Sequence, residues 1–260
     1  MKKLVFVNQK GGTGKSTLSY NFAHFLADKG FRVLFIDGDE QANASKSLAV
    51  FSSMTGTSTL FGSEKIEPLT MPQQIVLMKG DDGLRKVEKS SCSDEELVQA
   101  LTERLEDVSS GFDYAVIDTA GANSRVANAL TVASDYTVLP CRIDPYSIEV
   151  ATQVIKRIAF IQRSWNPELT NIGILPNEFD ATSPAQVSWL KQLMGAYKDY
   201  VVGAFVAKRS AYREAAGKGV PVWRLGTDED EGKGRVKTSA RNAGRELKAV
   251  FEIVLRRMEH

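Results

Sequence analysis

The chain is poor in cysteine and has no long apolar run, and each shortage excludes a class of protein. Its two cysteines, Cys92 and Cys141, are too few for a disulfide framework and lack the spacing of a metal site, which favours a reducing compartment. No apolar stretch approaches the ~20 residues that span a bilayer, and the run after Lys2 and Lys3 is too short for a signal peptide. The sequence therefore predicts a soluble cytoplasmic protein.

The chain has almost no net charge, but its basic and acidic residues are unevenly distributed along the sequence. The 260 residues are 43% hydrophobic and 25% charged, which is ordinary for a globular protein. Lys and Arg number 33 against 32 Asp and Glu, so the net charge of +1 gives no sign of a nucleic-acid partner. From Phe205 to the end, however, 13 residues are basic and 8 acidic, whereas 20 basic and 24 acidic residues precede them. No linker or repeat divides the chain, and we expect residues 1–260 to form one domain.

Short apolar runs alternate with amphipathic helical patterns, which predicts an α/β fold with a mostly parallel, twisted sheet covered by helices on both faces. Ser93 and Glu96 have the spacing of a helix capping box. Residues 52–72 and 226–234 are rich in Ser, Thr, Gly or charge and are expected to be irregular. Strands are expected at 4–7, 33–36, 75–78, 114–117, 138–140, 172–175 and 201–202, and helices at 15–29, 93–108, 146–164, 184–196 and 239–258.

A glycine-rich turn joins the first expected strand to the first expected helix. Its residues are Gly11, Gly12, Thr13, Gly14, Lys15, Ser16 and Thr17. Glycines let the backbone curl so that N–H groups point at phosphate oxygens, and the helix N-terminus favours an anion there. Lys15 is expected to reach the β- and γ-phosphates of a nucleotide, and the Ser16 hydroxyl to coordinate Mg²⁺. Asp118, which ends the apolar run 114–117 and precedes Gly121, has the arrangement of a Walker B carboxylate with a glycine amide near the γ-phosphate.

Further motifs carry a family resemblance. Lys10 precedes the first glycine, and this doubled-lysine P-loop resembles the deviant Walker A motif of the ParA/MinD family of ATPases. Residues 37–43, Asp-Gly-Asp-Glu-Gln-Ala-Asn, are similar to the family's Asp-x-Asp-Pro-Gln-Gly-Asn, in the form typical of the ParA branch. Asn21 matches a Val-Asn-Leu-Ala stretch, and residues 214–221 resemble Glu-Ala-Pro-Ser-x-Gly-x-Pro. Glu40 and Ala42 replace the usual Pro and Gly, which implies an altered loop after the second strand.

The resemblance implies an ATP- and Mg²⁺-dependent ATPase. Two ATP-bound subunits would form a homodimer in which Lys10 reaches the partner's phosphates, while Lys15 binds the subunit's own. Asp39 matches the water-orienting catalytic carboxylate, so Lys10, Lys15 and Asp39 are the implied catalytic residues. Ser16 and Asp118 would hold Mg²⁺ with Asp37 beside them. The implied nucleotide contacts are Lys10, Gly11, Gly12, Thr13, Gly14, Lys15, Ser16, Thr17, Asn21 and Gly121.

The ParA branch partitions plasmids and chromosomes, so the resemblance also implies double-stranded DNA bound without sequence preference, a nucleoid-associated location and a ParB-like adaptor that accelerates slow hydrolysis. The DNA surface would include Lys208, Arg209, Arg213, Arg241 and Arg245, although a merely solvated basic face would explain these residues as well.

Two rival functions share the same ATPase core: positioning of a different cargo, such as a protein complex or conjugation machinery, and membrane association as in MinD. Membrane binding is the less favoured of the two, because the last expected helix has the stripe of a core-packed helix. A metabolic enzyme or metallochaperone of related fold would need a substrate pocket or paired cysteines. The first strand begins too early for an N-terminal helix-turn-helix domain.

Overall fold

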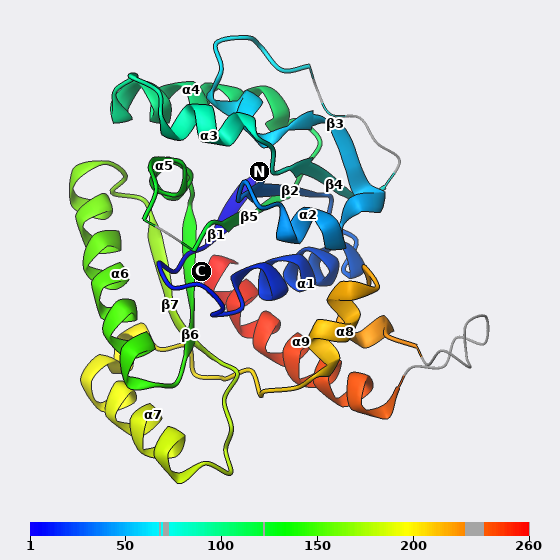
Figure 1. Ribbon diagram of the computed structural model, residues 1–260, viewed down its shortest axis with the longest axis vertical. Coiled ribbons are helices and arrows are strands. Elements are labelled where there is room, and N and C mark those ends of the chain that lie inside the picture. The colour runs from blue at the N-terminus through cyan, green and yellow to red at the C-terminus, as the bar shows by residue number, and fades with distance from the viewer. Residues whose placement is uncertain (68, 70–72, 122, 227–236, 260) are drawn as a thin grey trace.

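The computed structural model describes residues 1–67, 69, 73–121, 123–226 and 237–259. In this part of the chain, seven strands form one sheet in the order β3-β4-β2-β5-β1-β6-β7, with all neighbours parallel (Figure 1). The strands are β1 (Lys2–Phe6), β2 (Val33–Gly38), β3 (Ser52–Gly56), β4 (Ile75–Lys79), β5 (Tyr114–Thr119), β6 (Tyr136–Arg142) and β7 (Thr170–Asn177). The predicted parallel α/β fold is confirmed.

Helices cover both faces of the sheet. The α-helices are α1 (Lys15–Asp28), α2 (Asn43–Ser47), α3 (Gly83–Glu88), α4 (Asp94–Ser109), α5 (Arg125–Val132), α6 (Pro145–Ser164), α7 (Pro184–Tyr197), α8 (Ala211–Gly217) and α9 (Thr238–Glu259). Short 3₁₀ turns are η1 (Ala49–Phe51), η2 (Thr57–Phe61), η3 (Lys198–Tyr200) and η4 (Val222–Arg224). Ser93 caps α4 and Glu96 bonds back to it, which confirms the predicted capping box.

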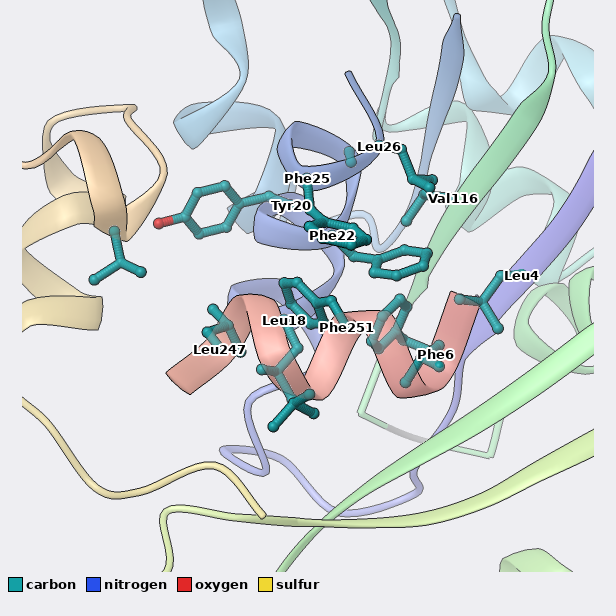
Figure 2. Close-up of a cluster of buried hydrophobic side chains, with 14 of the residues drawn as sticks. Leu4, Phe6, Leu18, Tyr20, Phe22, Phe25, Leu26, Val116, Leu247 and Phe251 are labelled. Carbon is teal, nitrogen blue, oxygen red and sulfur yellow. The ribbon is translucent and has the colours of Figure 1, made fainter. Parts of the chain in front are cut away.

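Two apolar cores lie on opposite faces of the sheet, because successive strand residues point to opposite sides. Leu4 and Phe6 of β1 belong to the core with α1 and α9, whereas Val5 belongs to the core with α4, α5 and α6. Figure 2 shows the first of these cores. Phe22 of α1 lies at its centre, with its ring 5.1 Å from that of Phe251 on α9. The predicted apolar stripe of the last helix is therefore part of the core. Within the described residues, no helix is long and apolar enough to cross a membrane.

Two strand predictions were wrong. Residues 52–56 are strand β3 rather than irregular chain: it has no apolar alternation because it lies at the sheet edge, where Ser53 Oγ donates to the Leu77 carbonyl at 2.8 Å. Residues 201–202 do not form a strand, because only Val201 pairs with Ile174. In the expected irregular segment 226–234, residues 227–234 lie outside the described residues, as do 68 and 70–72 of the segment 52–72.

The loop after β2 keeps a left-handed backbone residue at position 42, although Ala42 stands where the family motif has glycine. Ala42 precedes α2 with φ 52° and ψ 41°, the left-handed region that glycine occupies more readily. Its N–H donates to the Asp39 carbonyl at 2.9 Å, so this turn fixes the backbone that follows Asp39. The fold thus keeps a glycine-type turn with an alanine in it, at a cost in conformational energy.

We therefore expect Ala42→Gly to stabilise the protein. Glycine removes the strain of a left-handed alanine in the folded state, but it also gives the unfolded chain more conformational freedom. The first effect is the larger, so the free energy of unfolding should rise by about 0.5–1 kcal/mol. Urea unfolding measures it. The matched control is Ala44→Gly, two residues on inside α2, which should lower stability because that residue is helical and buried. A lower urea midpoint for Ala42→Gly would show that the backbone of Ala42 is not strained.

Candidate nucleotide-binding site

The turn between β1 and α1 has the backbone of a phosphate-binding loop. Gly12 and Gly14 have φ values of 72° and 91°, and Gly14 is the N-cap residue of the 14-residue helix α1 without a side-chain cap. The helix N-terminus therefore keeps backbone N–H groups free for an anion. Gly121, after β5, lies against this loop, since a Cβ added there would be 3.1 Å from Gly11 Cα. A side chain at position 121 would crowd the loop backbone, so this glycine favours the close approach of the predicted Walker B segment to the P-loop.

Lys15 and Asp118 are buried together beneath the loop. Lys15 is 6% exposed and Asp118 is fully buried. Burial lowers the pKa of Lys15, while the carboxylates of Asp118 and Asp39 oppose that shift. Burial, and next the charge of Asp37, raise the pKa of Asp118, against the favourable influence of Ser16 and Lys15. Among the described residues neither oxygen of Asp118 has a hydrogen-bond partner, although the nearby Ser16 hydroxyl acts to lower the pKa of this carboxyl group. The buried carboxylate therefore lacks the partners that a folded protein normally supplies.

Asp37 lies beside Asp118 in the sheet, since the two residues are paired in the register of β2 and β5. Unlike Asp118, it has several donors: Asp39 N at 3.1 Å to one oxygen, and Ser45 N and Oγ at 2.8 and 2.6 Å to the other. Burial raises the pKa of Asp37, and these hydrogen bonds oppose the shift. Asp37 thus fastens the Asp39 loop and α2 to the end of β2. Its predicted place beside a metal stays a prediction.

The residues present fit a magnesium ion that is bound together with a phosphate. Across the described chain, no three His, Cys, Asp or Glu side chains form a metal-binding cluster. Mg²⁺ commonly keeps its waters and uses one or two carboxylates plus substrate phosphates, so a dedicated protein cage is not required. The unpartnered carboxylate of Asp118, beside Ser16, would accept hydrogen bonds from waters of such an ion. Ser16 and Asp118 are the side chains that would hold it.

Lys10 lies at a different edge of the site. Its Nζ donates to Ser147 Oγ at 2.8 Å and lies 3.4 Å from Asp144 Oδ1, both at the N-terminus of α6. The side chain is 34% exposed. The two lysines of the motif therefore lie in different environments. Lys15 is buried with Asp118, whereas Lys10 is held at the surface by two hydrogen bonds.

A cavity of about 420 Å³ opens beside the loop glycines. Asn177, at the end of β7, forms part of its wall and donates from Nδ2 to the Thr13 carbonyl at 2.7 Å. Asn177 was not predicted, although its position at the carboxyl end of a parallel strand was a usable signal. Glu178 beside it has a left-handed φ of 51°. The full lining is Gly12, Gly14, Thr17, Leu18, Asn177, Glu178, Val206, Lys208, Arg209, Ser210, Tyr212 and Arg213. Its size and position suit the base and ribose of a nucleotide.

Several predicted residues lie elsewhere than the sequence suggested. The Asn21 side chain is fully buried and does not line this cavity: it donates to the Thr17 carbonyl and accepts from Val222 N, which fastens η4 to α1. Its predicted nucleotide contact has no support in this geometry. Lys208, Arg209 and Arg213, predicted for DNA, line the nucleotide-sized cavity. Arg209 is moreover occupied by both carboxylate oxygens of Glu246.

Arg241 and Arg245 are exposed on α9, one turn apart, and neither forms an ion pair with a described residue. Their neighbour Lys248 differs, since it pairs with Asp28 at 3.2 Å and lies over the Trp223 ring. Some of the basic side chains of the C-terminal region therefore already pair with acidic side chains of the same protein. The exposed arginines of α9 remain available to a partner.

Together, the glycine loop, the buried Lys15 and the carboxylate of Asp118 at the ends of parallel strands define a P-loop nucleotide-binding protein. Comparison with known proteins then places the chain. Residues 1–171 match the family described as an AAA domain (AAA_31). Protein IncC of Escherichia coli is 32% identical over 269 aligned residues, covering 100% of this chain and 70% of that protein. The chromosome partitioning protein ParA of Myxococcus xanthus is 26% identical, covering 83% of this chain and 78% of that one.

Solved structures agree on the fold. Cyanothece McdA without nucleotide has a TM-score of 0.78 at 21% identity, covering 96% of this chain and 99% of that one. Cobyrinic acid a,c-diamide synthase from Mycobacterium smegmatis, solved with ADP and magnesium, has a TM-score of 0.76 at 18% identity, covering 100% of this chain and 96% of that one. This chain belongs to the ParA family of deviant Walker A ATPases, as its motifs predicted.

The site predicts that Lys15→Ala weakens nucleotide binding by roughly 10- to 100-fold, because charge-assisted hydrogen bonds to phosphate oxygens are lost. Titration calorimetry with ATP and Mg²⁺ measures the dissociation constant. The matched control is Lys29→Ala, at the other end of α1, where the lysine pairs with Glu252. Unchanged affinity in folded Lys15→Ala would contradict the site.

Proposed function

We propose that this protein hydrolyses ATP with Mg²⁺ and uses the cycle to partition DNA. The observation that carries the proposal is that Lys15 and the unpartnered carboxylate of Asp118 are buried close enough to influence each other's pKa, beside an open helix N-terminus. Lys15 would neutralise the phosphates, and backbone N–H groups of the loop would orient them. Mg²⁺, when bound, neutralises charge on the phosphate oxygens. The cavity beside Asn177 would hold the base and ribose.

Asp39 is the residue that we assign to positioning the attacking water. Its Oδ1 accepts from Gln41 N at 2.9 Å, while Oδ2 has no partner among the described residues. One oxygen therefore fixes the carboxylate, and the other is free to accept a hydrogen bond from water. Catalysis of this kind depends on positioning and charge stabilisation, which is consistent with slow basal turnover.

ATP would also control assembly. In the homodimer, Lys10 leaves the α6 N-terminus and pairs with the partner subunit's phosphates. That exchange replaces two partly exposed contacts, to Asp144 and Ser147, with charge-assisted hydrogen bonds to an anion. Without a γ-phosphate, Lys10 has no anion to pair with across the interface, and the subunits separate. Nucleotide state is in this way converted into oligomeric state.

The dimer would bind double-stranded DNA without reading sequence, and so associate with the nucleoid. Exposed Arg241 and Arg245 support this, together with the partition function named for the Myxococcus relative. Dimerisation doubles the number of phosphates contacted, and affinity rises steeply with that number. A ParB-like adaptor would then stimulate hydrolysis and release the dimer from DNA. Binding of cargo through this adaptor completes the proposed cycle.

We expect Asp39→Ala to bind ATP with nearly normal affinity but to lose at least about 100-fold in turnover, because the carboxylate that positions the attacking water is removed. Phosphate release and ATP titration, measured on the same preparation, separate the two effects. Loss of ATP binding in this variant would show that Asp39 supports the fold of the loop instead.

Lys10→Ala serves as the contrasting variant, because it leaves the subunit's own phosphate site intact. Sedimentation with ATP should show dimers for Asp39→Ala and monomers for Lys10→Ala. Dimers of both variants at similar protein concentrations would contradict the proposed role of Lys10.

DNA binding should depend on α9. We expect Arg241→Ala/Arg245→Ala to reduce the slope of log affinity against log salt concentration by about 2 per subunit, since about 0.9 is lost per phosphate contact. Binding of ATP-loaded protein to a long duplex of arbitrary sequence, at several salt concentrations, gives that slope. Lys191→Ala, an exposed lysine on α7, is the control. An unchanged slope would mean that these arginines are only solvated, and would favour a membrane or another cargo over DNA as the partner.

A further inference from the structure

A second hollow lies on the side of the molecule away from α9. It is a groove of about 260 Å³ between α4, α5 and α6. Its walls are mainly apolar and include Leu97, Val132 and Trp165. Phe160, also in the lining, is 48% exposed and adds an apolar ring to the open side of the groove. The groove thus has the apolar walls of a binding site, but it lies apart from the nucleotide cavity.

Two arginines line this groove, and their environments differ. Arg125 is used internally: Nε donates to Asp94 at 2.8 Å, and the terminal nitrogens donate to the Ser90 and Cys92 carbonyls. Arg157 donates only from Nε, to Asn128 Oδ1 at 2.8 Å. Among the described residues its two terminal nitrogens have no partner. A half-buried guanidinium with its terminal N–H groups free is suited to a bidentate carboxylate.

Arg157 is also connected to the nucleotide site. Asn128, which accepts from Arg157, donates in turn to Asn123 Oδ1 at 3.3 Å. Asn123 comes two positions after Gly121, the glycine that lies against the phosphate loop. A small cavity of about 40 Å³ lies along the same route, between Arg157 and Asn8 of the chain just before Lys10. A chain of side-chain hydrogen bonds therefore runs from Arg157 in the groove to Asn123, two positions after Gly121 in the sequence.

We propose that this groove is a docking surface for an apolar segment of a partner protein that carries one acidic side chain. The apolar walls bury the segment, and the terminal nitrogens of Arg157 bind its carboxylate. The positive charge of Arg157 is the only one in the described groove that no carboxylate or backbone carbonyl of the protein already satisfies. The bound segment changes nucleotide affinity through Asn128 and Asn123. This second step rests on the proposed nucleotide function, whereas docking itself does not.

The test uses two capped tripeptides, acetyl-Phe-Glu-Leu-amide and its Gln counterpart, titrated into the full chain. The chain has three tryptophans, so indole N–H resonances give three signals, and Trp165→Phe assigns the one in the groove. We expect the Glu peptide to shift the Trp165 signal and to bind at least about tenfold more tightly than the Gln peptide. Arg157→Gln should abolish that preference. Arg163→Gln, an exposed arginine on the same helix that does not line the groove, should preserve it.

Equal affinity for the two peptides, or no shift of Trp165 at about 5 mM peptide, would overturn the docking proposal. Equally tight binding of 4-phenylbutyrate would replace the protein partner with a small carboxylate. For the coupling, the Glu peptide should change the affinity for ADP and Mg²⁺ by at least about threefold in the wild type but not in Asn128→Ala. An equal change in both would remove Asn128 from the route. Absence of nucleotide binding in the wild type would contradict the proposed function while leaving the peptide result intact.

Discussion

The buried carboxylate of Asp118 is the constraint on which the rest of the site depends. An ionised or neutral carboxyl group without hydrogen-bond partners is costly inside a protein, and here Asp37 is placed beside it by the register of β2 and β5. The protein offsets part of this cost with Lys15, itself buried and attracted by the same carboxylate. The fold alone supplies no hydrogen-bond partner to either oxygen of Asp118. A ligand that brings negative oxygens to the lysine and a hydrated cation to the aspartate would complete both groups, and a nucleoside triphosphate with Mg²⁺ has that chemistry.

The surrounding chain is organised to hold these two groups still while leaving room for the ligand. Gly121 allows the Walker B segment to approach Gly11, and Asn177 fixes the Thr13 carbonyl from the far strand. Asp37 uses its hydrogen bonds to anchor the loop that presents Asp39. Lys10 alone is kept at the surface, by α6, the same helix that carries Arg157. Helix α6 is therefore connected toward the proposed nucleotide site at two places: through Lys10, which precedes the glycine loop, and through Asn128, which bonds to Asn123.

The fold and the phosphate loop were predictable from the sequence because both depend on local patterns. Buried parallel strands are continuous apolar runs, and the glycine loop has a fixed spacing before Lys15. Strand β3 was missed because its polar residues lie at the sheet edge, where pairing needs no apolar alternation. Asn177 was missed because it meets the loop from 164 positions away in sequence. Local pattern also could not reveal which basic residues are already paired: Arg209 with Glu246 and Lys248 with Asp28 become visible only in three dimensions.

The central claim is that Lys15 and Asp118 are completed only by nucleotide and metal together. The most direct measurement is the thermal unfolding midpoint of the wild-type chain with ATP and Mg²⁺, with ATP and a chelator, and with Mg²⁺ alone. Because a ligand that binds only the folded state stabilises it by about 2.7 kcal/mol at a hundred times its dissociation constant, ATP with Mg²⁺ should raise the midpoint by several degrees. ATP without metal should raise it less, and Mg²⁺ alone should leave it nearly unchanged. An equal rise with Mg²⁺ alone, or no rise under any condition at millimolar ATP, would contradict the account.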